Sequence, residues 1–123
     1  MLSKDQISAA YDRPREWLPV QDWTPAGETF DATKHGVYVG TMSAGDLESY
    51  EMALSQRKEG EVLNIRALLA VRCVQNADGS RVFADTDADW LGQKAFGPLD
   101  DIADIALRLN KRRKDDYDQL VKN

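Results

Sequence analysis

One segment constrains the fold of this chain more than any other, because it is apolar on most sides. Residues 66–74 read Arg-Ala-Leu-Leu-Ala-Val-Arg-Cys-Val, and their unbroken apolar run extends from Ala67 to Val71. Apolar residues recur here at helical intervals: Val62, Ile65, Leu69 and Cys73 form one stripe, and Leu63, Leu68, Val71 and Val74 widen it. This spacing predicts a largely buried helix over residues 61–75. The other elements must therefore pack around it.

The N-terminal third predicts a short helix and two strands. Ser3 and Gln6 have the spacing of a capping box, which predicts a helix over residues 3–12. Residues 17–20 read Trp-Leu-Pro-Val and are typical of an edge strand, where a proline is tolerated. Residues 37–42 are β-branched and aromatic and predict a second strand. The polar stretch between the strands fits a hairpin with a long loop or, nearly as well, a flexible arm.

Two more helices are predicted on either side of the apolar segment. Ser43 and Asp46 have capping-box spacing, with Asp in place of the usual Glu or Gln, and Gly60 is expected to stop this helix. Gly97-Pro98 is expected to open the last helix, because proline suits a first helical turn. The inward faces of the two helices are expected to be Leu47, Tyr50 and Leu54 in the first, and Leu99, Ile102, Ala106 and Leu109 in the second.

Between these helices the sequence predicts a turn and a short acidic helix. Asp78-Gly79 favours a turn, because glycine accepts a positive φ and aspartate bonds to nearby backbone. Residues 81–83 read as a short extended piece. Thr86 is expected to cap a helix with Asp87 and Asp89 in its first turn and with Trp90 and Leu91 pointing inward.

Together these elements predict an α+β fold that is mostly α-helical, with four to five helices and a small N-terminal β-hairpin. The chain of 123 residues favours a single domain over residues 1–123, in which 1–36 form an arm or hairpin region and 112–123 a tail. The core is expected to contain Leu54, Ile65, Leu68, Leu69, Phe83, Trp90, Ile102 and Leu109.

Composition excludes several classes of function. The net charge of -5 argues against nucleic acid as the main partner, because phosphate binding depends on a cationic surface. The longest apolar run is far too short to span a bilayer, and the first residues lack the apolar core of a secretory signal. A single cysteine, Cys73, excludes an internal disulfide and suits a reducing compartment. We therefore expect a soluble domain.

No metal or cofactor site is predicted. Residues 85–89 read Asp-Thr-Asp-Ala-Asp and resemble the start of a calcium-binding EF-hand loop. That loop requires glycine at its sixth position and glutamate at its twelfth, where this chain has Trp90 and Phe96. Helix capping explains these acidic residues better. The glycines at Gly36 and Gly40 lack the Lys-Ser/Thr ending of a phosphate-binding loop.

No catalytic residues are predicted either. His35 is the only histidine, so it would have to act with Ser43, Ser55 or Cys73, and none of these lies on a recognisable nucleophile turn. Cys73 falls in the apolar stripe, where an inert core thiol is expected. The basic run from Arg108 to Lys114 is followed at once by acidic residues. This pattern is typical of a solvent-exposed helix end.

The three tryptophans bear on partner binding, because aromatic residues are enriched at protein–protein interfaces. Trp90 is expected in the core, whereas Trp17 and Trp23 fall in the N-terminal region. Exposed aromatic side chains there would be candidates for a partner surface.

From Gly40 to Asn110 the order of these segments resembles one family, the tail assembly chaperones of long-tailed bacteriophages and prophages. A strand ends in Ser43-Ala44-Gly45, a helix carries residues 47–51, and the apolar helix and an Asp-Gly turn follow. Val82-Phe83 then precedes an acidic helix start, and the last helix ends in residues 106–110, Ala-Leu-Arg-Leu-Asn. The long insertion from Pro25 to Gly36 and the sequence Arg112-Arg113-Lys114 depart from the family pattern.

The resemblance implies that the protein binds other proteins and catalyses no reaction. Such proteins bind the tape measure protein and the major tail-tube protein while the tail is built, in the cytoplasm of the bacterial host, and are absent from the finished virion. Many also have a longer form made by ribosomal frameshifting, and codons for Lys122-Asn123 can include the run of adenines on which ribosomes slip. Self-association into a homo-oligomer is also compatible with the resemblance. The alternatives are a regulatory or nucleic-acid-binding module of a prophage and a metal-free enzyme.

Overall fold

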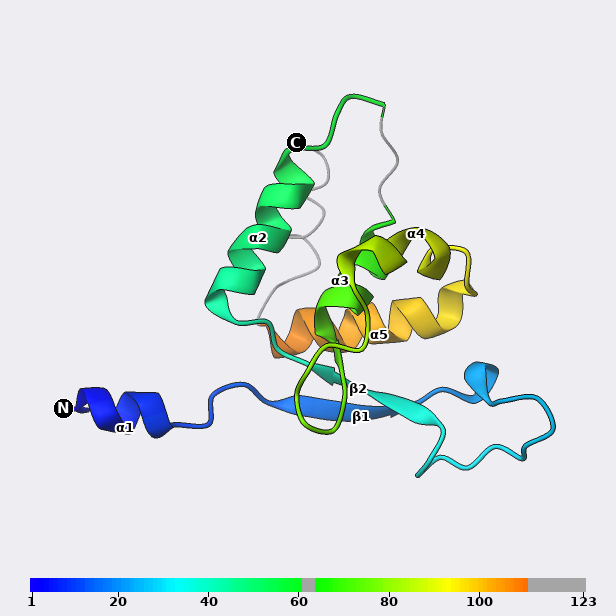
Figure 1. Ribbon diagram of the computed structural model, residues 1–123, viewed down its shortest axis with the longest axis horizontal. Helices are drawn as coiled ribbons and strands as arrows, with labels where there is room; N and C mark the ends of the chain where they lie inside the picture. The colour runs from blue at the N-terminus through cyan, green and yellow to red at the C-terminus, as the bar shows by residue number, and fades with distance from the viewer. Residues whose placement is uncertain (61–63, 111–123) are drawn as a thin grey trace.

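The computed structural model describes residues 1–60 and 64–110, and its architecture is helix-rich α+β with an N-terminal hairpin, as the sequence predicts. The described residues form an antiparallel sheet in the order β1-β2-β3, with α3, α4 and α5 on one side of it and α2 standing apart (Figure 1). The strands are β1 (Arg15–Pro19), β2 (Gly36–Gly40) and β3 (Val74–Gln75). The α-helices are α1 (Lys4–Ala9), α2 (Ala44–Ser55), α3 (Ile65–Cys73), α4 (Ala88–Leu91) and α5 (Phe96–Leu109). Two 3-10 helices are η1 (Gln21–Trp23) and η2 (Asp85–Asp87).

Of the two expectations for the N-terminal region, the hairpin with a long loop is confirmed. β1 pairs with β2 along its whole length, so Trp17 lies opposite Tyr38, and Pro19 occupies the edge of the sheet. The loop is tied to the strands by hydrogen bonds from the Trp17 indole to the Ala32 carbonyl, at 2.8 Å, and from the Val20 amide to the His35 carbonyl, at 2.9 Å. Trp17 is therefore half-buried, with its indole held by the loop.

The predicted apolar helix is α3, and it forms the centre of the core. Leu69 is 2% exposed, and Ala70, Val71 and Cys73 are completely buried. The helix ends at Cys73 rather than at Gln75, because Val74 adopts an extended conformation and pairs with Val39 of β2. The expected residues Val62 and Leu63 lie outside the described residues.

The flanking helices have the predicted caps but differ at their ends. Ser3 and Gln6 form a complete capping box, although α1 stops at Ala9 instead of Asp12. The Ser43 hydroxyl accepts a hydrogen bond from the Asp46 amide at 3.1 Å, as expected. α2 ends at Ser55, before Gly60, whose φ of 80° instead serves a turn.

The last long helix also agrees with its predicted face. α5 begins at Phe96, so Pro98 falls in its first turn, where no backbone donor is lost. Leu99, Ile102 and Ala106 are buried, and Leu109 is half-buried. The basic residues after Asn110 and the predicted tail over residues 112–123 lie outside the described residues.

Two predictions about the short acidic helix are wrong. Thr86 does not cap it; the Asp87 carboxylate accepts the Ala84 amide at 2.8 Å instead, and the chain enters α4 through η2. Trp90 is 48% exposed, whereas Leu91 is only 2% exposed. Neighbouring residues in a helix point about 100° apart, so a helix of one turn buries only one of them. Of the other expected core residues, Ile65, Leu68 and Phe83 are half-buried, while Leu54, Leu69 and Ile102 are fully buried.

Gly36 and Gly40 at the ends of β2 have a packing role rather than a phosphate-binding one. A Cβ on Gly36 would collide with the Leu18 carbonyl oxygen, and one on Gly40 would collide with the Gln75 side chain. Both glycines therefore let neighbouring strands approach β2 closely. No helix in the described ranges is long and apolar enough to cross a membrane.

Leu69→Ala is expected to lower the free energy of unfolding by about 2–5 kcal/mol, because it leaves a cavity beside residues that cannot all collapse into it. Urea denaturation followed by circular dichroism measures the change. Met52→Ala, on the exposed side of α2, is the matched control and is expected to stay within about 0.5 kcal/mol of the parent. Equal midpoints for the parent and Leu69→Ala would show that α3 does not hold the core together.

Candidate functional site

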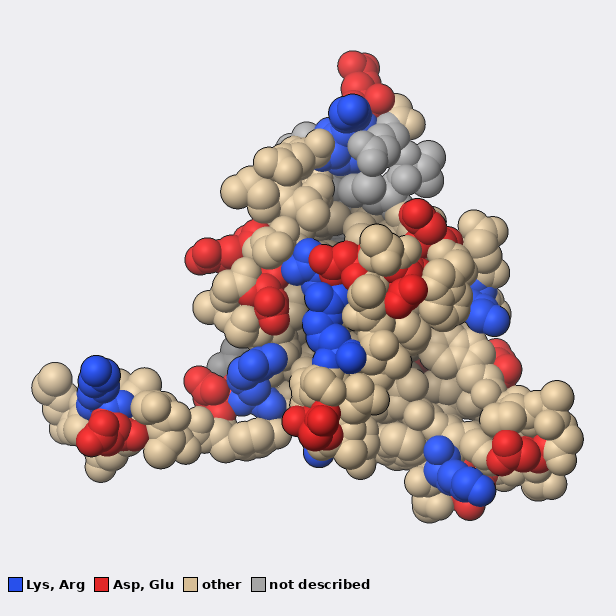
Figure 2. Space-filling model, in the orientation of Figure 1, with Lys and Arg blue, Asp and Glu red and all other residues tan. Residues whose placement is uncertain are grey.

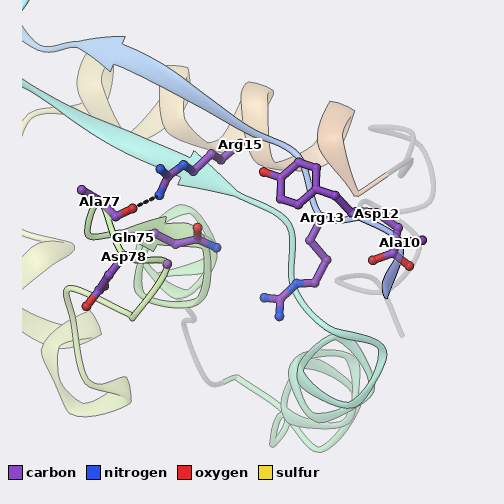
Figure 3. Close-up of a pocket in the computed structure, with 9 residues that line it drawn as sticks. Ala10, Asp12, Arg13, Arg15, Gln75, Ala77 and Asp78 are labelled. Atoms are coloured by element: carbon purple, nitrogen blue, oxygen red, sulfur yellow. Dashed lines mark hydrogen bonds between the residues drawn. The ribbon is translucent and has the colours of Figure 1, made fainter. Parts of the chain in front are cut away.

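A polar groove lies where the chain between α1 and β1 passes the turn after β3 (Figure 3). It has a volume of about 490 Å³ and is lined on one side by Tyr11, Asp12 and Arg13, and on the other by Gln75 and Asp78. Arg15 spans it, donating to the Ala77 carbonyl at 2.6 Å and to the Asn76 carbonyl at 3.2 Å. Its guanidinium also stacks 4.4 Å from the centre of the Tyr38 ring.

Three charged side chains of this groove, those of Arg13, Arg15 and Asp78, are bonded to the protein itself. Arg13 donates to the Thr41 carbonyl at 2.9 Å. The Ser80 hydroxyl and amide donate to Asp78 at 2.6 and 2.9 Å, and these hydrogen bonds hold the pKa of Asp78 below its usual value. The groove thus works as a tie between the N-terminal segment and the β3 turn, and its lining residues include no nucleophile paired with a base.

A second groove is aromatic, and it lies against α4. It measures about 460 Å³ and is lined by Asp22, Trp23, Thr24, Phe83, Trp90, Leu91 and Lys94. The Trp90 ring stands edge-on to Phe83, with 5.9 Å between ring centres, and its indole nitrogen donates to the Asp87 carboxylate at 2.8 Å. Buried Leu91 anchors α4 beneath it. The indole is consequently held in place while half of it remains open to solvent.

We refer to the residues Trp23, Phe83 and Trp90 as the aromatic groove. Sequence reasoning placed Trp23 among the surface candidates but assigned Trp90 to the core. The signal that could have corrected this is length: α4 is confined between Asp87 and Gly92, which leaves room for a single turn. A single turn that buries Ala88 and Leu91 has no inward position left for Trp90.

Other apolar side chains are exposed on α1. This helix has no buried residue, and it lies apart from the rest of the described chain (Figure 1). Ile7 and Tyr11, in and just after α1, are both exposed. Unlike the aromatic groove, α1 offers no concave surface of its own, so it provides contact area without a pocket.

The residues considered for catalysis are not brought together. The ring of His35 lies between Glu28, with Nε2 and Oε1 3.1 Å apart, and the Asp31 amide, which donates to Nδ1 at 3.0 Å. Ser43 caps α2, and the Ser55 hydroxyl donates to the Met52 carbonyl at 3.0 Å. His35 therefore orders its own loop.

Cys73 is the core thiol that the apolar stripe predicts. It is completely buried, and burial raises its pKa to about 12, against the smaller opposing effect of Asn110 beside the sulfur. A thiol with this pKa carries almost no thiolate near neutral pH, so it is a poor nucleophile and a poor metal ligand.

Two of the three acidic residues that resemble a calcium-loop opening, Asp85 and Asp87, bond to protein groups. Asp85 accepts from Arg81 at 2.6 Å and lies 3.1 Å from Arg72, and the Arg81 hydrogen bond is the main reason that the pKa of Asp85 is lowered. Asp87 binds the Ala84 amide and the Trp90 indole. Among residues 1–60 and 64–110, no three His, Cys, Asp or Glu side chains gather into a possible metal site.

The surface does not offer one continuous cationic field on the face seen in Figure 2, where basic and acidic side chains alternate. Several arginines act as internal ties. Arg72 donates to the Asp46 carbonyl and pairs with Asp85, while Arg81 donates to the Val71 carbonyl at 2.8 Å. Arg108, the first residue of the predicted basic run, forms an ion pair with Glu16; the rest of that run lies outside the described residues.

Comparison of the chain with protein-family models, curated proteins and solved structures gave no match.

Cys73 is expected to resist alkylation in the folded protein, because on the order of one thiol in ten thousand is ionised at pH about 8 when the pKa is near 12. Iodoacetamide labelling followed by intact-mass measurement is the test, with the same protein in guanidinium chloride as the control that must label fully. Stoichiometric labelling of the folded protein within minutes would contradict this account of the core.

Proposed function

We propose that this chain is a tail assembly chaperone of a long-tailed bacteriophage or prophage, which binds the tape measure protein in the bacterial cytoplasm before the tail is complete. The order of segments between Gly40 and Asn110, which resembles that family, supports the proposal. It predicts binding to the major tail-tube protein as well, and absence of this chain from the finished virion.

The observation that carries the proposal is that Trp90 is exposed and held in place within the aromatic groove. Tryptophan is the residue that most often dominates binding energy at protein interfaces, where it fills or flanks a pocket. Here Trp23 and Phe83 supply apolar walls, while Asp22 and Lys94 supply a polar rim. An apolar core with a polar rim is the usual anatomy of a protein–protein interface. We assign the groove to an apolar segment of the tape measure protein.

The charge of the chain suits this role. A protein that holds a long apolar partner must keep the complex from aggregating, and a net charge of -5 opposes self-association. Asp22, Asp87 and Asp89 lie in or next to the elements that form the aromatic groove. Like charges there disfavour contact between grooves of two copies, while an uncharged apolar segment is not repelled.

In the described part of the chain, no comparable observation supports either alternative function. An enzyme would need converging polar groups in a cleft, whereas Arg13, Arg15 and Asp78 of the polar groove are bonded to backbone carbonyls and to Ser80. A nucleic-acid-binding module would need a basic face. Gene neighbourhood gives the cheapest discrimination, since the chaperone proposal requires a tape measure gene nearby, normally just downstream.

Co-expression with the downstream tail genes tests the proposal directly. The tape measure protein is expected to be soluble with this chain, to be recovered with it on affinity purification, and to aggregate without it. Equal solubility with and without the chain, combined with failure to recover the two together, would rule out the chaperone function.

Trp90→Ala is expected to weaken binding to the tape measure protein by roughly tenfold or more, the usual cost of truncating a central interface tryptophan. Tyr11→Ala is the matched control, because Tyr11 is 79% exposed but lies outside the aromatic groove. Titration of a tagged apolar tape measure fragment measures both affinities, and the melting midpoint confirms that each variant is folded. If the two variants bind alike, the groove is the wrong surface even where the chaperone function holds.

A further inference from the structure

A smaller groove adjoins the aromatic groove at Lys94. It has a volume of about 240 Å³, and its lining includes Asn64 and Arg66 at the start of α3, Gly92 and Lys94 between α4 and α5, and Phe96 at the start of α5. We call it the Phe96 groove, because Phe96 is 63% exposed. Lys94 also lines the aromatic groove, so the two concave surfaces meet at this residue.

The turn that separates the two grooves is held by the rest of the fold. The Lys94 amide donates a hydrogen bond to the Leu91 carbonyl at 3.0 Å. Gly92 lies so close to the start of α3 that an added Cβ would collide with the Asn64 side chain. The backbone of Lys94 is therefore fixed at the boundary of the grooves, at the same end of the molecule as η1 (Figure 1).

Phe96 resembles Trp90, because it is exposed and yet held by a neighbouring side chain. The Arg66 guanidinium lies 4.8 Å from the centre of the Phe96 ring and pairs with Asp100 at 2.8 Å. An aromatic ring that is already positioned loses little conformational entropy on binding. The two grooves together therefore offer a partner two aromatic anchors.

The size of the aromatic groove favours a partner segment that extends beyond it. Stable protein–protein interfaces bury about 800 Å² on each partner, and contacts with one side chain such as Trp90 supply only part of that area. The concave surface continues from the aromatic groove over Lys94 to the Phe96 groove. A segment seated on Trp90 gains a second aromatic contact if it follows this path.

Charge determines what such a segment must carry at the boundary. Arg66 is paired with Asp100, and the lining of the Phe96 groove contains no acidic residue. Asp22 lines only the aromatic groove, and within residues 1–60 and 64–110 Lys94 forms no ion pair. A wholly apolar segment would cover the Lys94 ammonium without a counter-ion, which costs free energy. A carboxylate at this point offsets that cost.

We propose that the partner segment in the aromatic groove continues over Lys94 onto Phe96 and carries an acidic residue between two apolar ones. The first apolar residue contacts Trp90, the carboxylate meets the Lys94 ammonium, and the second apolar residue contacts Phe96. This inference rests on the proposed function, because it describes the same segment of the tape measure protein.

Charge reversal at the boundary tests the ion pair, with a tagged apolar fragment of the tape measure protein as the probe. Lys94→Glu is expected to weaken binding by roughly tenfold, because it brings two carboxylates together. Lys94→Gln is expected to remove most of the salt dependence between about 50 and about 500 mM sodium chloride. Lys4→Glu makes the same charge change on exposed α1 and is the matched control. Lys94 variants that bind like Lys4→Glu would overturn the ion pair and show that the lysine turns its ammonium into water.

Exchange of the two charges gives a test in which binding is gained. In the fragment, the acidic residue within the apolar stretch is replaced by Lys. This fragment is expected to bind Lys94→Glu more tightly than it binds the parent chain, because the ion pair is restored in reverse. Tighter binding to the parent would contradict the proposed contact.

Truncation of the second anchor tests the path of the segment. Phe96→Ala is expected to weaken binding of the same fragment by roughly fivefold or more, whereas Met52→Ala, at an exposed site on α2, is expected to have no effect. Melting midpoints confirm that each variant is folded. If Trp90→Ala weakens binding and Phe96→Ala does not, the segment ends at the aromatic groove, and this inference fails while the proposed function stands. If the fragment does not bind the parent chain, the proposed function fails as well.

Discussion

Helix α3 loses all contact with solvent where it meets α5 and β2, and this burial sets the positions of the elements around it. Ala70, Val71 and Cys73 are completely buried, and Ile102 and Ala106 of α5 lie in the same core. Buried alanines on both helices allow their backbones to approach closely. Because β3 begins at the residue after α3 ends, the same segment also supplies the third strand. The helical layer and the sheet are therefore joined through one continuous backbone and cannot shift independently.

The polar side-chain contacts between these elements set their relative positions more than they add to the free energy of unfolding. Asn110 accepts from the Met42 amide, donates to the Ala106 carbonyl at 2.7 Å and lies 3.9 Å from the Cys73 sulfur, so one side chain joins α5 to the start of α2 and to α3. Asp85 joins Arg72 of α3 to Arg81 in the same way. Exposed ion pairs contribute little free energy each. Their value here is that they hold the loop before α4 against α3, which determines where the aromatic groove opens.

Most of the features that the sequence predicts correctly follow from local rules. Capping at Ser3 and Ser43, the apolar stripe of α3 and the face of α5 all depend on residues within a few positions of each other. β3 could not be predicted, because two residues have no periodicity and their conformation is set by pairing with β2. The same reason explains Trp90: a four-residue helix gives no pattern from which an inward face can be read. The aromatic groove could not be predicted from the sequence, because Trp23, Phe83 and Trp90 come together only in the folded chain.

In the single turn of α4, one residue packs into the core while the next is exposed. Leu91 points inward and holds α4, while its neighbour Trp90 points outward and is fixed by Phe83 and the Asp87 carboxylate. An aromatic side chain already held in one orientation loses little conformational entropy on binding, so more of its contact energy remains as affinity. In the proposed chaperone, that arrangement lets the groove bind apolar segments of varied sequence, because the rigid aromatic walls supply most of the contact. Leu91, and not Trp90, belongs to the core beneath α4, so a substitution at Trp90 leaves the buried residues around α3 in place.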